Sequence, residues 1–208
     1  MTRKARLVGV SDYSNSSLRA LPGATTDVRG MFKLLSTNHD GTQNFDCGSP
    51  MTTRHEFATT ITRDTLNDRI ERLFDSQGDD VLFYYSGHGV DHSGDVALAT
   101  ADATWDQPGI PMKRVVELAN NSRARSVTLI LDCCHAAGAM SRTVPNGVDH
   151  FPIESIREDV TLLAAARSTQ AAMENGEGGV FTSLLVNGLR GAAADIRGRV
   201  TAASLYSL

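Results

Sequence analysis

The chain reads VLFYYSGHG from residue 81 to residue 89 and VTLILDCCH from residue 127 to residue 135. The first five residues of each stretch are aliphatic, aromatic or β-branched, which predicts a buried strand. Just past these strands the chain carries His88 in one case and Cys134 in the other, 46 residues apart. A histidine within hydrogen-bond reach of a cysteine can take up the thiol proton, so the two stretches predict a cysteine nucleophile and its base.

The remainder of the chain alternates between short apolar runs and helical periodicities. Apolar runs at 5–10 and 160–165 predict two further strands, and a shorter run at 96–98 predicts a hairpin strand. The segment 39–60 is rich in Gly, Thr and Asn and predicts a loop with room for a short strand. Helical spacing predicts four helices, whose apolar faces are Val28, Met31, Phe32 and Leu35; Leu66, Ile70, Leu73 and Phe74; Met112, Val115, Val116 and Ala119; and Phe181, Leu184, Leu185 and Leu189. A fifth, short helix is expected from Ala202, with Thr201 as its N-cap.

Strands that alternate with helices indicate βαβ units and a mostly parallel sheet. In such a sheet the carboxyl ends of the strands lie at one edge, where ligands and catalytic residues gather. Neighbouring strands are about 4.8 Å apart, so His88 and Cys134 would meet if their strands are neighbours. Gly87 and Gly89 permit a tight turn around His88. The backbone N–H groups of Gly89 and Cys134 are therefore candidate donors to an oxyanion.

Composition limits the possible classes of protein. A chain of 208 residues with 41% hydrophobic and 21% charged content suits one globular α/β domain. The net charge of −4, with no basic block, gives no support to nucleic-acid binding. No apolar run approaches the roughly 18 residues of a membrane span, and the N-terminus lacks the apolar stretch of a signal peptide. Three cysteines, two of them adjacent, do not make a disulfide framework, which favours a reducing, cytoplasmic setting.

Four stretches together resemble the caspase family, and most closely its metacaspase and bacterial caspase-like branch. They are the histidine loop at 86–89, the Asp-x-Cys-His motif at 132–135, the segment ending in aspartate at 21–27, and the strand, loop and helix at 162–182. The resemblance implies a caspase-like three-layer sandwich, with a mostly parallel central sheet flanked by helices. It also implies a single peptidase domain over 1–208, with a large-subunit-like part over about 1–138, a linker over about 139–159 and a small-subunit-like part over about 160–208.

The same resemblance implies roles for particular residues. His88 corresponds to the base, and Cys134, not Cys133, to the nucleophile. Asp27 and Asp132 correspond to the carboxylates of an acidic specificity pocket, and Ser86 to a polar residue of its wall. Such a pocket accepts Arg or Lys before the scissile bond, and two carboxylates at one sheet edge would attract a basic side chain on physical grounds as well. We therefore expect a cysteine endopeptidase whose partners are protein or peptide substrates with a basic residue before the cut.

Two regulatory properties follow from the resemblance as expectations. Family members often cut themselves between their two halves, and Arg142 is the candidate cleavage site in the stretch that we expect to be an exposed linker, with Arg157 next. Many relatives need Ca²⁺. Asp79, Asp80, Asp91 and Asp95 could supply carboxylates, but without EF-hand spacing. We therefore expect no required cofactor and no resident metal, with Ca²⁺ left open.

Other interpretations remain beside this one. Branch members usually carry a small polar residue where Cys133 stands, a departure that leaves the catalytic pair intact and bears on fine specificity. Asp27 could serve only the first turn of its helix, and Asp132 only a turn. A metal site at 133–135 with His88 is disfavoured because adjacent cysteines rarely fit zinc ligation. A catalytically silent regulatory module of a larger signalling protein, with fused or co-encoded sensor or effector domains, is the main alternative, and a flavodoxin-like ligand-binding domain is the second.

Overall fold

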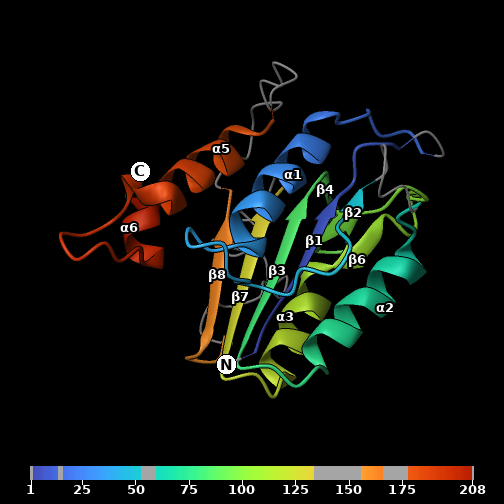
Figure 1. The fold of residues 1–208 in the computed structure, drawn as a ribbon. Coiled ribbons are helices and arrows are strands. Elements are labelled where there is room, and N and C mark those ends of the chain that lie inside the picture. Colours follow the sequence, from blue (N-terminus) through green and yellow to red (C-terminus); the bar gives the residue numbers. More distant parts are fainter. Residues whose placement is uncertain (1, 14–15, 53–59, 134–155, 166–177, 208) are drawn as a thin grey trace, which may run out of the picture.

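A five-stranded parallel sheet forms the centre of the described part of the molecule (Figure 1). The computed structural model describes residues 2–13, 16–52, 60–133, 156–165 and 178–207. The strand order is β2-β1-β3-β7-β8, with the bounds Met51–Thr52, Arg3–Gly9, Asp80–Ser86, Ser126–Asp132 and Val160–Ala164. Strands β3 and β7 are neighbours, as the spacing argument requires. The predicted strands and the mostly parallel sheet are therefore confirmed.

Helices cover both faces of this sheet and make a three-layer sandwich (Figure 1). One face carries α1 (Gly23–Ser36) and α5 (Val180–Asn187), and the other carries α2 (Arg63–Phe74) and α3 (Met112–Asn121). Successive strand residues point to opposite faces, so β3 places Leu82 and Tyr84 in the core under α1 and α5, and Phe83 and Tyr85 in the core over α2 and α3. Burial on both faces explains why the strands read as continuous apolar runs.

A second, antiparallel sheet follows β3 directly. It consists of β4 (Gly89–His92), β5 (Asp95–Ala99) and β6 (Gly109–Pro111). Ser93 and Gly94 join β4 to β5 with φ angles of 50° and 83°, the positive values that a two-residue hairpin turn requires. The hairpin strand predicted at 96–98 is confirmed as the middle of β5.

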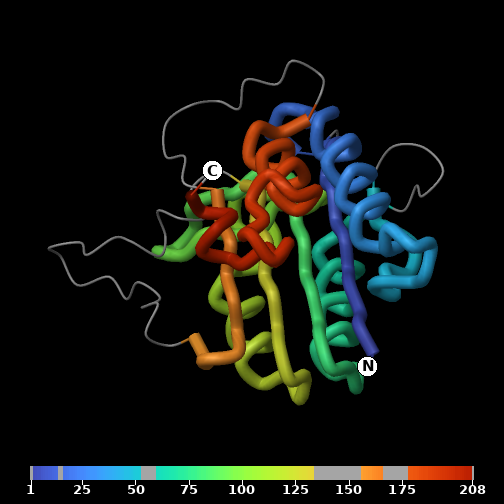
Figure 2. The backbone as a smooth tube through the Cα atoms, turned by 60° about the vertical axis from the view of Figure 1, so that its left-hand side comes forward, coloured from blue at the N-terminus to red at the C-terminus, as the bar shows by residue number. Residues whose placement is uncertain are grey.

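The C-terminal part departs from prediction at one position. Helix α5 continues into the π-helix η2 (Gly188–Ala192), and α6 (Ala202–Tyr206) begins at Thr201 with a capping box, as expected. Leu184, however, is 46% exposed, so its assignment to the buried face is wrong. Leu185 is buried and Phe181 packs against the same cluster, which turns Leu184 away from α1. The C-terminal segment lies beside β8, where the Tyr206 hydroxyl donates to the Leu162 carbonyl at 2.9 Å (Figure 2).

The end of the expected linker is attached to the domain. Residues 134–155, including Arg142, lie outside the described part of the chain, but Arg157 lies within it and is only half-exposed. Its guanidinium donates to the carbonyls of Asn120, Ser122 and Ala124 at 3.2, 2.8 and 3.1 Å. Arg157 thus caps the C-terminal end of α3, where a cation is favoured. The expected exposed linker therefore reaches, at Arg157, a residue whose guanidinium is bonded to the domain, whereas Glu158 and Asp159 are exposed.

Candidate active site

The histidine loop and the Asp-x-Cys-His motif begin level with each other at the carboxyl edge of the sheet. The β3–β7 register pairs Ser86 with Asp132, the last residue of each strand. The Gly87 N–H donates to the Asp132 carbonyl at 3.2 Å, which holds the two strand ends together. His88 is the second residue after Ser86, and Cys134 is the second residue after Asp132. Cys134 lies outside the described residues, so its role as nucleophile stays a prediction.

His88 is oriented through its ring and through its backbone. Its Nε2 lies 2.7 Å from the carbonyl oxygen of Arg19. A carbonyl only accepts, so the neutral ring carries its proton on Nε2 and leaves the lone pair on Nδ1. Partial burial lowers the pKa of His88 from its ordinary value, and the hydrogen bond to Arg19 opposes that shift. The imidazole is therefore neutral near pH 7, the form that a general base needs.

Two tyrosines bind the backbone of the histidine loop. The Tyr13 hydroxyl accepts a hydrogen bond from the His88 N–H at 2.9 Å, and the two rings lie 4.8 Å apart between centroids. The Tyr85 hydroxyl lies 3.1 Å from the His88 carbonyl and 2.7 Å from the Ala99 carbonyl, to both of which it can donate. Sequence reasoning did not single out either tyrosine.

The three residues assigned to an acidic pocket lie together. Asp27 is 5% exposed, and its carboxylate accepts from the Ser86 hydroxyl at 2.9 Å and from the Gly179 N–H at 2.8 Å. The Asp132 carboxylate accepts from the N–H and the hydroxyl of Thr182 at 3.2 and 2.6 Å. Asp27 lies beyond the first turn of α1, so the interpretation that it serves only that turn is wrong. Asp132 does more than end a strand, because its carboxylate binds Thr182.

The two carboxylates are adjacent. A side-chain carbon at Gly179 would lie 2.7 Å from Asp132 Oδ2 and 3.1 Å from Asp27 Oδ2. A side-chain carbon at Gly178 would lie 2.6 Å from Asp27 Oδ1, and the φ angle of Gly178 is +110°. Glycine at both positions lets the backbone approach both carboxylates. Sequence reasoning missed this close approach, because two glycines in a polar loop do not indicate which side chains will lie next to them in the fold.

Tyr84 and Thr182 complete the acidic cluster. The Tyr84 hydroxyl lies 2.6 Å from the Thr182 hydroxyl. Burial raises the pKa of Tyr84 well above its ordinary value, and the nearby Asp27 and Asp132 raise it further. The phenol therefore stays protonated and donates to Thr182, whose own proton goes to Asp132. The sequence placed Tyr84 only in a predicted buried strand, and Thr182 only in a stretch that resembles the caspase family.

Cys133 and Gly89 occupy positions that bear on the catalytic assignment. The Cys133 side chain is 3% exposed and belongs to the core over α2 and α3. Such burial suits a structural cysteine rather than a nucleophile. The Ala99 N–H donates to the His88 carbonyl, so the next pair, Gly89 and Leu98, is a non-hydrogen-bonded pair of the β4–β5 ladder. The Gly89 N–H is therefore directed away from β5.

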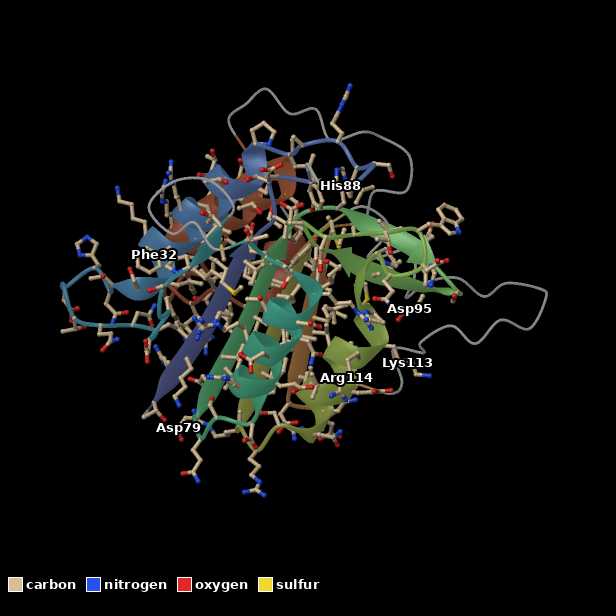
Figure 3. All side chains as sticks on the ribbon, turned by 90° about the vertical axis from the view of Figure 1, so that its right-hand side faces the viewer. Phe32, Asp79, His88, Asp95, Lys113 and Arg114 are labelled. Carbon is tan, nitrogen blue, oxygen red and sulfur yellow. The ribbon has the colours of Figure 1, made fainter. Side chains whose placement is uncertain are left out.

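The four aspartates considered for Ca²⁺ do not form one cluster. Asp79, at the N-terminal end of β3, accepts from the Thr2 N–H, whereas Asp95 in the second sheet accepts from the Val96 and Lys113 N–H groups. Figure 3 shows Asp79 at the opposite end of the domain from His88, with Asp95 beside Lys113. Among the residues that the structure describes, no group of three or more His, Cys, Asp or Glu side chains could hold a metal ion.

A parallel sheet between two helical layers, with a small antiparallel sheet after its histidine strand, defines a caspase-like α/β fold. The Peptidase_C14 family model, described as the caspase domain, matches residues 2–204. The chain therefore belongs to the caspase-domain family of cysteine peptidases. The solved structure of pro-sf-caspase-1 is similar to this chain with a TM-score of 0.56 and 13% identity, and the match covers 93% of this chain and 72% of that one. No curated protein matches the sequence significantly. Within the described residues, no helix is long and apolar enough to cross a membrane.

Proposed function

We propose that this chain is a cysteine endopeptidase that cleaves proteins after Arg or Lys, with Cys134 as nucleophile and His88 as base. One observation carries the proposal: two adjacent carboxylates, Asp27 and Asp132, lie at the same sheet edge as His88. The Arg19 carbonyl binds Nε2 of this histidine, which leaves the Nδ1 lone pair to take up a proton.

The proposed reaction uses these groups in order. Nδ1 of His88 takes the proton from Cys134 Sγ, and the thiolate attacks the scissile carbonyl carbon. The N–H groups of Gly89 and Cys134 stabilise the oxyanion of the tetrahedral intermediate. The His88 imidazolium then gives its proton to the leaving amine, which breaks the C–N bond and leaves a thioester. Water, deprotonated by His88, hydrolyses the thioester and regenerates the thiol.

Charge is the basis of the proposed specificity. A guanidinium or ammonium group would form charge-assisted hydrogen bonds with Asp27 and Asp132, beside the Ser86 hydroxyl. An aspartate side chain would instead meet two like charges and be rejected. Gly178 and Gly179 supply the close backbone wall, because any side chain there would occupy the space next to the carboxylates.

Self-cleavage near Arg142 forms part of the proposal. Arg157, the next basic residue considered, donates to three carbonyls at the end of α3 and would have to leave them to enter an active site. We therefore assign the cut to Arg142. Mass spectrometry of incubated wild type and of Arg142→Ala tests the assignment, and a product cut after Arg157 contradicts it.

The experiment for the whole proposal compares two adjacent cysteines. Purified wild type, Cys134→Ala and Cys133→Ala are assayed on fluorogenic peptides with Arg, Lys or Asp before the scissile bond, with and without added Ca²⁺. We expect turnover of the Arg and Lys peptides by wild type and Cys133→Ala and none by Cys134→Ala. Asp27→Asn should lower kcat/KM for the basic peptides. Turnover that survives Cys134→Ala contradicts the mechanism, and preference for Asp contradicts the acidic pocket. A folded wild type without turnover in any condition favours the silent regulatory module.

A further inference from the structure

We infer that Tyr13 is a positioning residue that sets the place of the His88 imidazole. The inference deepens the proposed function, on which its catalytic part rests. Tyr13 is 1% exposed, and it touches His88 in two ways. Its hydroxyl accepts from the His88 N–H at 2.9 Å, and its ring lies 4.8 Å from the imidazole at an interplanar angle of 52°.

The loop passes close to two buried hydroxyl groups. A side-chain carbon at Gly87 would lie 2.5 Å from the Tyr85 hydroxyl and 2.8 Å from the Tyr13 hydroxyl. Burial, followed by the neighbouring Tyr13 and Cys133, raises the pKa of Tyr85 well above its ordinary value, so its phenol is protonated and can donate. The two hydroxyls therefore have different roles: Tyr85 donates to the Ala99 carbonyl at 2.7 Å, with the His88 carbonyl also in reach at 3.1 Å, and Tyr13 accepts from the His88 N–H.

Four contacts together define the position of His88. Its N–H, its C=O, its ring face and its Nε2 are each engaged, by the Tyr13 hydroxyl, the Ala99 N–H, the Tyr13 ring and the Arg19 carbonyl. Tyr13 supplies two of the four. Without its hydroxyl the His88 N–H loses its acceptor, and the loop that carries the imidazole loses one of the hydrogen bonds that hold its backbone. A displacement of about 1 Å in a reacting group can lower the rate of catalysis by up to roughly 10²-fold.

Tyr13→Phe isolates the hydroxyl, because the phenyl ring still fills the core beside His88. Tyr206→Phe is the matched control, since it removes a hydroxyl that also bonds backbone, the Leu162 carbonyl at 2.9 Å, away from the histidine loop. We expect kcat to fall about 10- to 100-fold in Tyr13→Phe, with KM within about twofold and both parameters unchanged in Tyr206→Phe. The small change in KM follows because other residues build the acidic cluster.

A second readout does not depend on turnover. In protein with ¹⁵N-labelled histidine, the Nε2–H resonance of His88 reports its hydrogen bond to Arg19, and titration reports its pKa. We expect Tyr13→Phe to shift or broaden this resonance and to move the pKa of His88 towards its ordinary value, because a looser ring is better hydrated. In the wild type, the His88 amide should be protected from hydrogen exchange by its bond to Tyr13, a measurement that stands even if Tyr13→Phe does not fold.

The outcomes separate the inference from the proposed function. An unchanged resonance, pKa and kcat in folded Tyr13→Phe overturn the positioning role. The positioning role is also overturned if the loss of kcat is explained entirely by the fraction of unfolded protein. It is overturned as well if the His88 amide of the wild type is not protected from hydrogen exchange. A wild type without peptidase activity overturns the proposed function alone, since the resonance and exchange measurements still decide what Tyr13 does to His88.

Discussion

Replacing Thr182 by valine tests whether the acidic cluster is held as the structure indicates. The two side chains have nearly the same shape, so the change removes one hydroxyl from a residue that is 3% exposed. That hydroxyl donates to Asp132 Oδ2 at 2.6 Å and accepts from the Tyr84 hydroxyl at 2.6 Å. One substitution therefore breaks two hydrogen bonds, and one of them goes to a charged group.

The loss can be estimated from these two bonds. A hydrogen bond to a charged group contributes about 1.5–3 kcal/mol. The fully buried Tyr84 hydroxyl loses its acceptor at a cost of about 1 kcal/mol, at the low end because the Ser86 hydroxyl remains near it. The free energy of unfolding should therefore fall by about 3 kcal/mol. In a domain of this size that corresponds to a lowering of Tm by about 6–12 °C.

Urea unfolding and thermal unfolding of Thr182→Val, Thr182→Ser and Tyr84→Phe give the measurement. Thr182→Ser keeps the hydroxyl and should stay within about 1.5 kcal/mol of the wild type, because it loses only a methyl group. The double variant of Thr182→Val and Tyr84→Phe should show a coupling of about 1 kcal/mol, since both remove the same bond. A stability of Thr182→Val within about 0.5 kcal/mol of the wild type, or additive effects in the double variant, would refute the reasoning.

Three further predictions concern the site and its supports. Gly179→Ala should lower kcat/KM for Arg peptides at least about tenfold, because the added side-chain carbon would lie 2.7 Å from Asp132 Oδ2. A kcat/KM equal to that of the wild type would contradict the proposed backbone wall of Gly178 and Gly179. Arg157→Ala should lower the free energy of unfolding in urea by about 2 kcal/mol, because three hydrogen bonds to carbonyls are lost. Arg114→Ala breaks an exposed ion pair and should lower it by less than about 0.5 kcal/mol. Equal losses in the two variants would contradict the capping role of Arg157. Burial lowers the pKa of His88 from 6.5, so the unfolded chain binds more protons between that value and the folded pKa, and stability should fall as pH drops through this window. The acidic limb of kcat/KM should accordingly lie below pH 6.5, and a limb above that value contradicts the lowered pKa.

The fold could be predicted from the sequence where strands are buried on both faces or where a helical spacing of apolar residues continues over several turns. Strands β3 and β7 stand in the sequence as unbroken apolar runs because helices cover both faces, and α1, α2 and α3 show their buried faces at helical spacing. Strands β4 and β6 were not recognised. They are short, contain Gly, His and Pro, and exist because they pair with β5. Such pairing is a tertiary effect that local propensity does not report.

The site was readable only in part, for a similar reason. Asp27, Ser86 and Asp132 were expected from the resemblance of their segments to the caspase family, and the shared sheet edge gave physical support for the two aspartates only. Tyr13 could not be predicted, since its role depends on a loop after β1 meeting a residue that lies 75 positions later in the chain. The Arg19 carbonyl had no signal at all, because any residue supplies a backbone carbonyl.

Strand β3 connects the acidic cluster to the histidine loop through its own alternation. Tyr84 and Ser86 lie on one face, where their hydroxyls reach Thr182 and Asp27. Tyr85 lies on the other face, where its hydroxyl reaches the carbonyls of Ala99, at the end of β5, and His88, just before β4. A register shift of one residue would exchange the two faces and destroy both arrangements at once. The seven-residue parallel pairing of β3 with β7 therefore does more than build the sheet: it fixes the distance between the proposed specificity site and the proposed base.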